Sequence, residues 1–250
     1  MGVCLSGRQR STGGGIPFDN YPNEKILLNE ETIWQGRNHN QNSIESMYII
    51  EDIRNLLWQN KYHEAQEKTA KEFLCYEISP RAFQPLGYLH VNYRMHPQSA
   101  IKSCTRNLSM NRGLAVNEIK TTDGYHIRQE VFSSFPDNMA VVHISSIDNK
   151  KLSMDLSLDR YDCFHTRAVG NDILIIDGQA EDERMKKSPG YNPVFKANRK
   201  LGTSFTGAIR ALSDGQVKSE AATLHIENVT HLYLFYVAST DYNADNPYIP

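Results

Sequence analysis

The segment LAVNEIKTTDGYHIRQEVFSS, residues 114–134, decides the fold of this chain of 250 residues. From Gln84 onward the apolar period becomes two residues, and residues 114–121 and 125–134 are two strand-like stretches within this region. This two-residue period is typical of a strand with one buried face. Asp123-Gly124 lies between the two halves, and this pair favours a type I′ turn between antiparallel strands. The segment therefore predicts a β-hairpin.

The same period continues on both sides of this hairpin. Upstream, four apolar side chains alternate with three polar ones, which predicts a half-buried strand: Leu89, Val91, Tyr93 and Met95 alternate with His90, Asn92 and Arg94. Further strands are predicted at 139–145, 152–158, 173–176, 205–212, 216–226 and 232–238, and the first two of these are expected to pair with each other. Because the turns between roughly nine such strands are too short for parallel crossovers, we expect a mostly β protein with a large antiparallel β-sandwich (supersandwich).

Before Gln84 the apolar period is that of a helix. Met47, Ile50, Ile53 and Leu57 recur at three- and four-residue steps, and a second, shorter helix is predicted over 62–74. The sequence thus predicts one β-sandwich domain over residues 1–250 with a short helical insertion at 43–74. Trp58 is expected to pack in a core or between the helix and the sheet. Two segments are predicted as loops, the Gly-rich residues 11–15 and the polar residues 180–200.

Composition and spacing exclude several function classes. The net charge is -2 and no Lys/Arg block occurs, which argues against a nucleic-acid partner. No apolar run approaches the roughly 20 residues that a membrane-spanning helix needs, so no membrane partner is expected. The cysteines at 4, 75, 104 and 163 lack the spacing of zinc ligands and favour thiols over a disulfide framework. The histidines form no metal motif, so we expect neither a metal nor another cofactor.

Four sets of residues resemble one known family. Ile26-Leu-Leu-Asn-Glu-Glu-Thr-Ile-Trp-Gln-Gly36 resembles the Leu-Asn-Glu-Asp-Thr-Leu-Trp-Ser-Gly signature in the N-terminal domain of glycoside hydrolase family 95, the α-L-fucosidases. Gln84-Pro-Leu-Gly-Tyr-Leu89 resembles the family's Gln-Pro-Leu-Gly-Asp-Leu strand, with Tyr88 in place of Asp. The third set is Arg106–Ser109 with Arg128–Ser134, where Gln129 interrupts the family's Arg-Glu pair, and the last is Phe205–Thr240. The matches follow the family's order across nearly the whole chain.

This resemblance implies a β-sandwich followed by a helical linker, an (α/α)₆ barrel and a small C-terminal β domain. It also implies hydrolysis of α-L-fucosidic bonds with inversion, in which an acid protonates the leaving oxygen and a base activates water on the opposite face. In the family these catalytic residues belong to the barrel, so no catalytic residue is assigned to this chain. The implied partners are the barrel domain and a fucosylated glycan. The chain is therefore expected to be a fragment, or the product of a truncated gene, from an enzyme family that is commonly exported.

The resemblance also implies a candidate substrate-binding site at Asn29, Glu30 and Trp34, which would border the cleft of the barrel. The structural alternative is a polar corner in which Asn and Thr bond the backbone, with Trp34 in the core. Glu30 and Glu31 are adjacent on a strand, so their side chains point to opposite faces and cannot flank one glycosidic bond together.

Two other functions remain open from the residues alone. One is a stand-alone carbohydrate-binding module, and the other is a structural remnant without a ligand. Sugar binding by the chain itself would separate these two.

Overall fold

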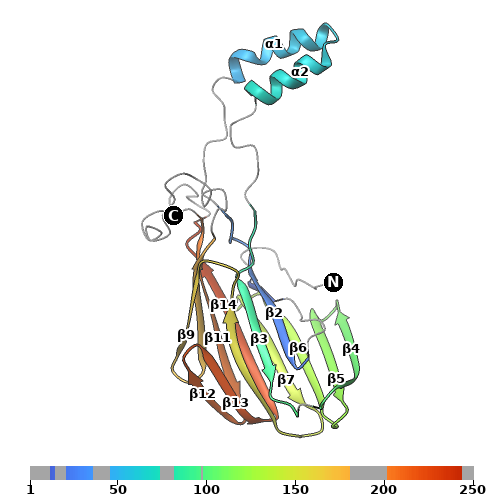
Figure 1. The fold of residues 1–250 in the computed structure, drawn as a ribbon, viewed down its shortest axis with the longest axis vertical. Coiled ribbons are helices and arrows are strands. Elements are labelled where there is room, and N and C mark those ends of the chain that lie inside the picture. The colour runs from blue at the N-terminus through green and yellow to red at the C-terminus, as the bar shows by residue number, and fades with distance from the viewer. Residues whose placement is uncertain are drawn as a thin grey trace. The chain divides into compact units, whose positions relative to one another are not determined.

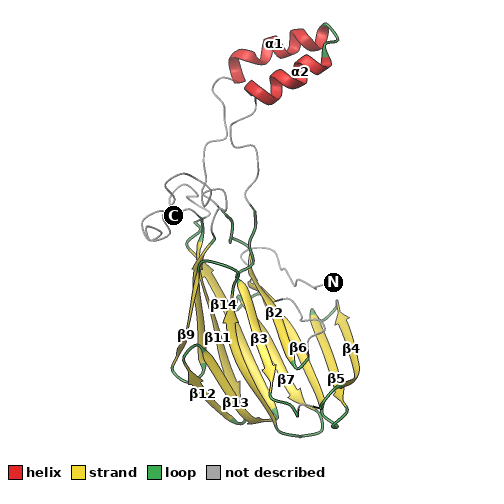
Figure 2. Cartoon of the chain, in the orientation of Figure 1, coloured by secondary structure: helices red, strands yellow, loops and turns green. Residues whose placement is uncertain are grey.

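The computed structural model describes residues 12–14, 21–35, 46–73, 82–96, 98–180 and 202–243. The chain divides into two compact units, one made of Met1–Gly36 with Phe83–Pro250 and the other of Arg37–Ala82. The first unit is an antiparallel β-sandwich and the second carries the helices, so the predicted fold class is confirmed (Figures 1 and 2).

The sandwich consists of two sheets in which every described strand pair is antiparallel. The six-stranded sheet has the order β1 (Thr12–Gly14), β2 (Asn23–Glu30), β3 (Gly87–Tyr93), β8 (Leu152–Asp159), β13 (Thr223–Val229) and β12 (Gln216–Glu220). The eight-stranded sheet has the order β4 (Ile101–Ser109), β5 (Leu114–Thr121), β6 (His126–Ser134), β7 (Met139–Ser146), β14 (His231–Thr240), β11 (Ser204–Ser213), β10 (Ile173–Gln179) and β9 (Phe164–Val169).

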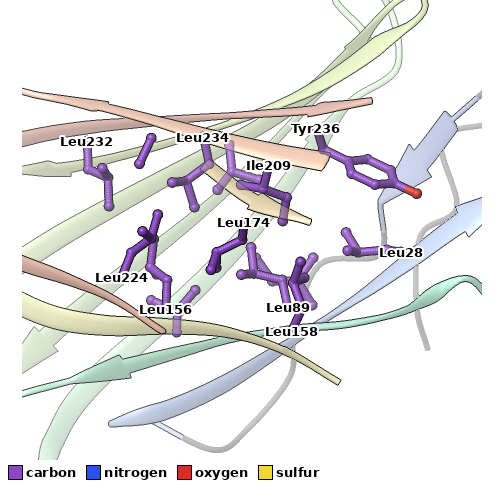
Figure 3. Close-up of a cluster of buried hydrophobic side chains, with 14 of the residues drawn as sticks. Leu28, Leu89, Leu156, Leu158, Leu174, Ile209, Leu224, Leu232, Leu234 and Tyr236 are labelled. Atoms are coloured by element: carbon purple, nitrogen blue, oxygen red, sulfur yellow. The ribbon is translucent and has the colours of Figure 1, made fainter. Parts of the chain in front are cut away.

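Alternating side chains build the core between these sheets. In β3 and β8 every second side chain is buried, and the residues between them are the polar ones that face away from the core. Figure 3 shows the buried cluster, in which side chains from both sheets meet: Leu28, Leu89, Leu156, Leu158 and Leu224 come from the six-stranded sheet, and Leu174, Ile209, Leu232, Leu234 and Tyr236 from the eight-stranded sheet. Burial of these apolar faces is the main force that holds the sheets together.

The hairpin of β5 and β6 forms where it is predicted, but its turn differs. The backbone N–H of Gly124 donates to the carbonyl of Thr121 at 3.2 Å, which places Thr122 and Asp123 at the centre of the turn. Within this turn Gly124 has a positive φ, 85°, whereas Thr122 and Asp123 do not. A type I turn followed by a glycine in the left-handed region has this form, so the predicted type I′ turn is wrong.

Two predicted strand arrangements are also wrong. β7 and β8 do not pair with each other but lie in different sheets, because the short connection at residues 147–151 crosses the sandwich. The predicted strand at 216–226 is two strands, β12 and β13, which form a hairpin around Ala221 with φ at 52°. Alternation identifies a strand with one buried face, but it does not show which sheet receives that strand.

Three strands, β2, β4 and β9, lie outside the predicted strand ranges, and one predicted loop contains a strand. β4 has exposed side chains along almost its whole length and β9 is also largely exposed, so neither shows the buried–exposed alternation that identifies a strand. Thr12–Gly14 pairs with Leu28–Glu30 as β1, within the stretch predicted as a loop. The polar loop predicted over 180–200 lies, except for Ala180, outside the described residues.

The second unit contains α1 (Ser46–Trp58), α2 (Tyr62–Lys68) and the π-helical turn η1 (Thr69–Phe73), all within the predicted insertion. Trp58 is 74% exposed, so its predicted place in a core is wrong. It is the last residue of α1. Among the described helices, none is long and apolar enough to span a membrane.

Gly87 begins β3 at a point where the backbone leaves no room for a side chain. A Cβ atom there would lie 2.6 Å from the carbonyl oxygen of Asp159 and 3.1 Å from Cδ1 of Ile176. We therefore expect Gly87→Ala to lower the free energy of unfolding by about 1–3 kcal/mol, measured by urea denaturation. Gly113→Asn is the control, because position 113 is open and Asn tolerates its φ of 59°. Equal stabilities of the two variants would contradict the proposed close contact.

Candidate functional site

The candidate site is a turn at the end of β2. The backbone N–H of Ile33 donates to the carbonyl of Glu30 at 3.3 Å and closes this turn. The side chain of Ile33 is fully buried, so it anchors the turn in the core. Beyond it, the carbonyl of Ile33 accepts from the N–H of Gln84 at 3.0 Å, and the carbonyl of Trp34 accepts from the N–H of Thr203 at 3.3 Å. Main-chain bonds to two distant segments therefore fix the position of Trp34.

Glu30 is buried and bonded within the turn. Its exposed fraction is 6%, and its Oε2 accepts from the backbone N–H of Thr32 at 2.8 Å and from the Thr32 hydroxyl at 2.5 Å. The same hydroxyl lies 2.5 Å from that of Thr240 on β14, in the other sheet. This chain of hydrogen bonds ties the two sheets together at this end of the sandwich. Glu31, the next residue, is exposed, but it lies in the turn beyond the end of β2, so the two carboxylates do not stand on one strand as predicted.

Asn29 is half-buried. Its carbonyl accepts from the hydroxyl of Tyr236 at 3.3 Å, while its side-chain Oδ1 is buried without a hydrogen-bond partner among the described residues. Burial, and then the charge of Glu30, raise the pKa of Tyr236 well above its usual value. The phenol therefore stays protonated and remains a donor to Asn29.

Trp34 presents the exposed part of the site. Its side chain is 47% exposed, and its indole Nε1 donates to the carbonyl of Glu31 at 2.9 Å. The ring meets that of Phe83 edge to face, with centroids 5.6 Å apart and planes at 66°. Phe83 is itself 41% exposed and lies opposite Trp34 in a β-bridge. Two aromatic rings thus lie at the surface on backbone that main-chain hydrogen bonds hold in place. Trp34 is therefore not a core residue.

The structure brings Asn29, Glu30 and Trp34 into one turn but gives them different surroundings. Glu30 bonds inside the fold and Asn29 is half-buried, so Trp34 is the residue of the three whose side chain is most available to a ligand. Sequence reasoning missed Phe83. The one indication in the sequence was that Phe83 directly precedes the Gln84-Pro-Leu-Gly motif. In the structure the N–H of Gln84 donates to the carbonyl of Ile33.

Other polar groups of the sandwich pair with one another across the strands. On the outer face of the six-stranded sheet, Asp155 accepts from Arg94 and lies 2.6 Å from Nδ1 of His225. Over the described residues, no group of three or more His, Cys, Asp or Glu side chains is placed to hold a metal ion. Cys104 and Cys163 carry thiols, while Cys4 and Cys75 lie outside the described residues.

Comparison with known proteins gives a match over most of the chain. The family model described as "Glycosyl hydrolase family 65, N-terminal domain" matches residues 13–245. One similar solved structure is described as "Putative kojibiose phosphorylase from human microbiome", with 8% identity and a TM-score of 0.41. The similarity covers 96% of this chain and 34% of that one, so this chain spans about a third of its length. No curated protein matches the chain.

Proposed function

Because this chain belongs to the family of glycosyl hydrolase family 65 N-terminal domains, we propose that it serves as the N-terminal β-sandwich of a glycoside hydrolase that cleaves α-L-fucosidic bonds. The family match supports one part of this proposal, namely that the chain is a domain of a glycosidase-type enzyme. The fucosidase part is supported by the motifs at Ile26–Gly36 and Gln84–Leu89, which resemble those of family 95.

The proposed task of the domain is to pack against a catalytic barrel and to form one wall of the substrate cleft. The observation that carries this proposal is the half-exposed ring of Trp34 on its rigid turn. A half-exposed Trp ring held in one orientation offers apolar area and a polar N–H edge to a ligand or partner domain. An aromatic ring offers a flat apolar face to the C–H groups of a sugar, much as it does to a nucleobase.

The chemistry itself needs two carboxyl groups that this domain is not proposed to supply. In an inverting hydrolysis one carboxylic acid protonates the leaving oxygen, while a carboxylate activates a water molecule on the opposite face of the sugar. Both would come from the barrel. The contribution of the sandwich is to orient the glycan and to exclude water beside Trp34, which places the scissile bond between these groups.

The test is an assay of the polypeptide that contains this domain together with its catalytic domain. We expect it to hydrolyse 2′-fucosyllactose and to release β-L-fucose first, which proton NMR detects before mutarotation. Phosphorolysis of kojibiose, with no hydrolysis of α-L-fucosides, would contradict the proposal. Saturable sugar binding by the chain of 250 residues, with no gain of activity from a catalytic domain, would instead favour a carbohydrate-binding module.

A further inference from the structure

The two outer faces of the sandwich differ in polarity. On the six-stranded sheet, most side chains that point outward from β3 and β8 are polar or charged: Tyr88, His90, Asn92, Ser153, Asp155, Ser157 and Asp159. On the eight-stranded sheet, the residues that β14 buries in the core alternate with Tyr233, Phe235 and Val237, which therefore point outward. The outer face of the eight-stranded sheet is thus apolar at β14.

The strands beside β14 extend this apolar surface. Phe235 pairs with Val141 on β7, which pairs with Phe132 on β6. In the other direction Val237 pairs with Ala208 on β11, which pairs with a residue of β10 that also points outward. We call the resulting surface the apolar face, and it consists of Phe132, Val141, Ile173, Ile175, Ala208, Leu212, Tyr233, Phe235 and Val237.

The side chains of the apolar face pack on one another. Val141 is 5% exposed, yet it does not belong to the buried cluster between the sheets. Its register partners Phe132 and Phe235 flank it on the outer side. The ring of Tyr233 lies parallel to that of His143, with centroids 4.2 Å apart, and remains 37% exposed. A continuous apolar surface of this kind marks an interaction site more often than apolar residues that occur singly.

Charged groups beside the apolar face are paired within the sheet. Arg210 lies between Phe235 and a residue of β10, and its Nε donates to Asp172 at 2.9 Å. Glu130 accepts from Arg128 at 3.0 Å. Because these opposite charges offset each other, the surroundings of the apolar face suit a partner whose contacting surface is apolar and uncharged. They do not suit a nucleic acid or an acidic segment.

The apolar face adjoins the end of the sandwich that carries Trp34. Val237 lies near the end of β14, where the hydroxyl of Thr240 is 2.5 Å from that of Thr32 in the Trp34 turn. β11 begins directly after Thr203, whose N–H donates to the carbonyl of Trp34. A domain that forms the other side of a cleft at Trp34 is therefore within reach of the apolar face.

The size of the apolar face favours one kind of occupant. With about 4.8 Å between strands and about 6.8 Å between outward residues of one strand, its side chains cover roughly 300 Å² of sheet. A stable complex of two separate proteins buries about 800 Å² on each partner. Interfaces between domains of one chain begin at about 600 Å² in total, or about 300 Å² on each side. The size therefore fits a domain of the same polypeptide, whose covalent link gives it a high effective concentration.

We propose that the apolar face binds the catalytic domain of the same polypeptide, through an apolar and uncharged surface of that domain. The inference rests on the proposed function, in which this N-terminal domain is joined to a catalytic domain. The contact holds β14 and β11, the two strands whose ends are bonded to the Trp34 turn. It thereby sets the position of Trp34 relative to the catalytic groups.

Hydroxyl-radical footprinting with mass spectrometry tests this contact without any substitution. The chain of 250 residues is compared with the polypeptide that also contains the catalytic domain. We expect Tyr233 and Phe235 to lose most of their oxidation in the longer polypeptide and to approach the low oxidation of the buried Tyr236. Tyr88, on the outer face of the six-stranded sheet, should be oxidised equally in both. Equal oxidation of Tyr233 in the two polypeptides would overturn the proposal.

A matched pair of variants shows whether the protection comes from the apolar face itself. Val237→Glu places a carboxylate within the face, at a residue that is 40% exposed. In the longer polypeptide this change should restore the oxidation of Tyr233, because an unpaired carboxylate opposes burial. Ile147→Glu, at a residue outside the face that is 49% exposed, should leave the protection intact. Protection that survives Val237→Glu, or that both variants remove, would contradict the contact.

Two further outcomes separate this inference from the proposed function. Protection of Tyr233 that develops in the chain of 250 residues as its concentration rises would assign the apolar face to a second copy and overturn the inference. Protection in a longer polypeptide that hydrolyses a glycoside other than an α-L-fucoside would support the inference, while it contradicts the fucosidase part of the proposed function.

Discussion

Replacing Phe205 with alanine is expected to lower the free energy of unfolding of the sandwich by about 3–5 kcal/mol. The ring of Phe205 is 3% exposed, and it covers Gly178 on the neighbouring strand β10, where a Cβ atom would collide with it. The guanidinium of Arg160 lies 4.5 Å from the centre of the same ring. Alanine would remove the ring from both neighbours and leave a cavity that the strands cannot close.

Phe164→Ala is the matched control for this prediction. Gly178 on β10 pairs with Phe205 on β11 at one side and with Phe164 on β9 at the other. Phe164 is 38% exposed, because β9 is the edge strand of the sheet. Its loss is expected to cost about 1 kcal/mol or less. Urea denaturation of the two variants measures the difference. If both lose the same stability, the assignment of Phe205 to the core is wrong.

The second large effect concerns catalysis. The chain of 250 residues alone is expected to give no turnover of 2′-fucosyllactose above background, a loss of at least about six orders of magnitude relative to an intact enzyme. A catalytic acid needs a raised pKa, and Glu24 has one, but its carboxyl is buried between the sheets and does not reach a substrate. Glu30 is bonded to Thr32 and is buried as well.

Sensitive detection of free L-fucose after long incubation measures this prediction. The control is the same assay with the polypeptide that also contains the catalytic domain. Turnover by the purified chain that a single substitution within it abolishes, while its melting temperature is unchanged, would show that the sandwich carries an active site of its own.

Most of the sandwich follows from the sequence because most strands have one buried face. β5 is predicted to the residue, and the apolar face of β3 is the one that alternation indicates. β4 and β9 escape prediction because their side chains are exposed on both faces, so nothing in their pattern distinguishes them from loops. The crossing from β7 to β8 was also missed, since pairing partners far apart in the chain decide which sheet a strand joins.

The candidate site was only partly predictable. The motif identifies the turn that carries Trp34, but not that Glu30 would bond to Thr32 and through it to Thr240, more than 200 positions along the chain. The contact of Phe83 with Trp34 likewise depends on a bridge between distant segments. Such pairings depend on how the two sheets pack at this end, which no local pattern encodes.

The proposed role of Trp34 in substrate binding is tested most directly by its replacement with alanine in a polypeptide that contains this domain together with its catalytic domain. The chain has two tryptophans, so Trp58→Ala, at an exposed residue of the helical unit, is the control. A ring that stacks on a sugar contributes about 1–3 kcal/mol, by analogy with stacking on nucleobases.

The measurement is kcat/KM for 2′-fucosyllactose together with the melting temperature of each variant. We predict that Trp34→Ala lowers kcat/KM roughly 5- to 150-fold, changes the melting temperature by no more than about 2–4 °C, and that Trp58→Ala alters neither quantity. An unchanged kcat/KM in Trp34→Ala, or a large fall in its melting temperature with normal kinetics in the folded fraction, would contradict the proposal that this turn borders the substrate cleft.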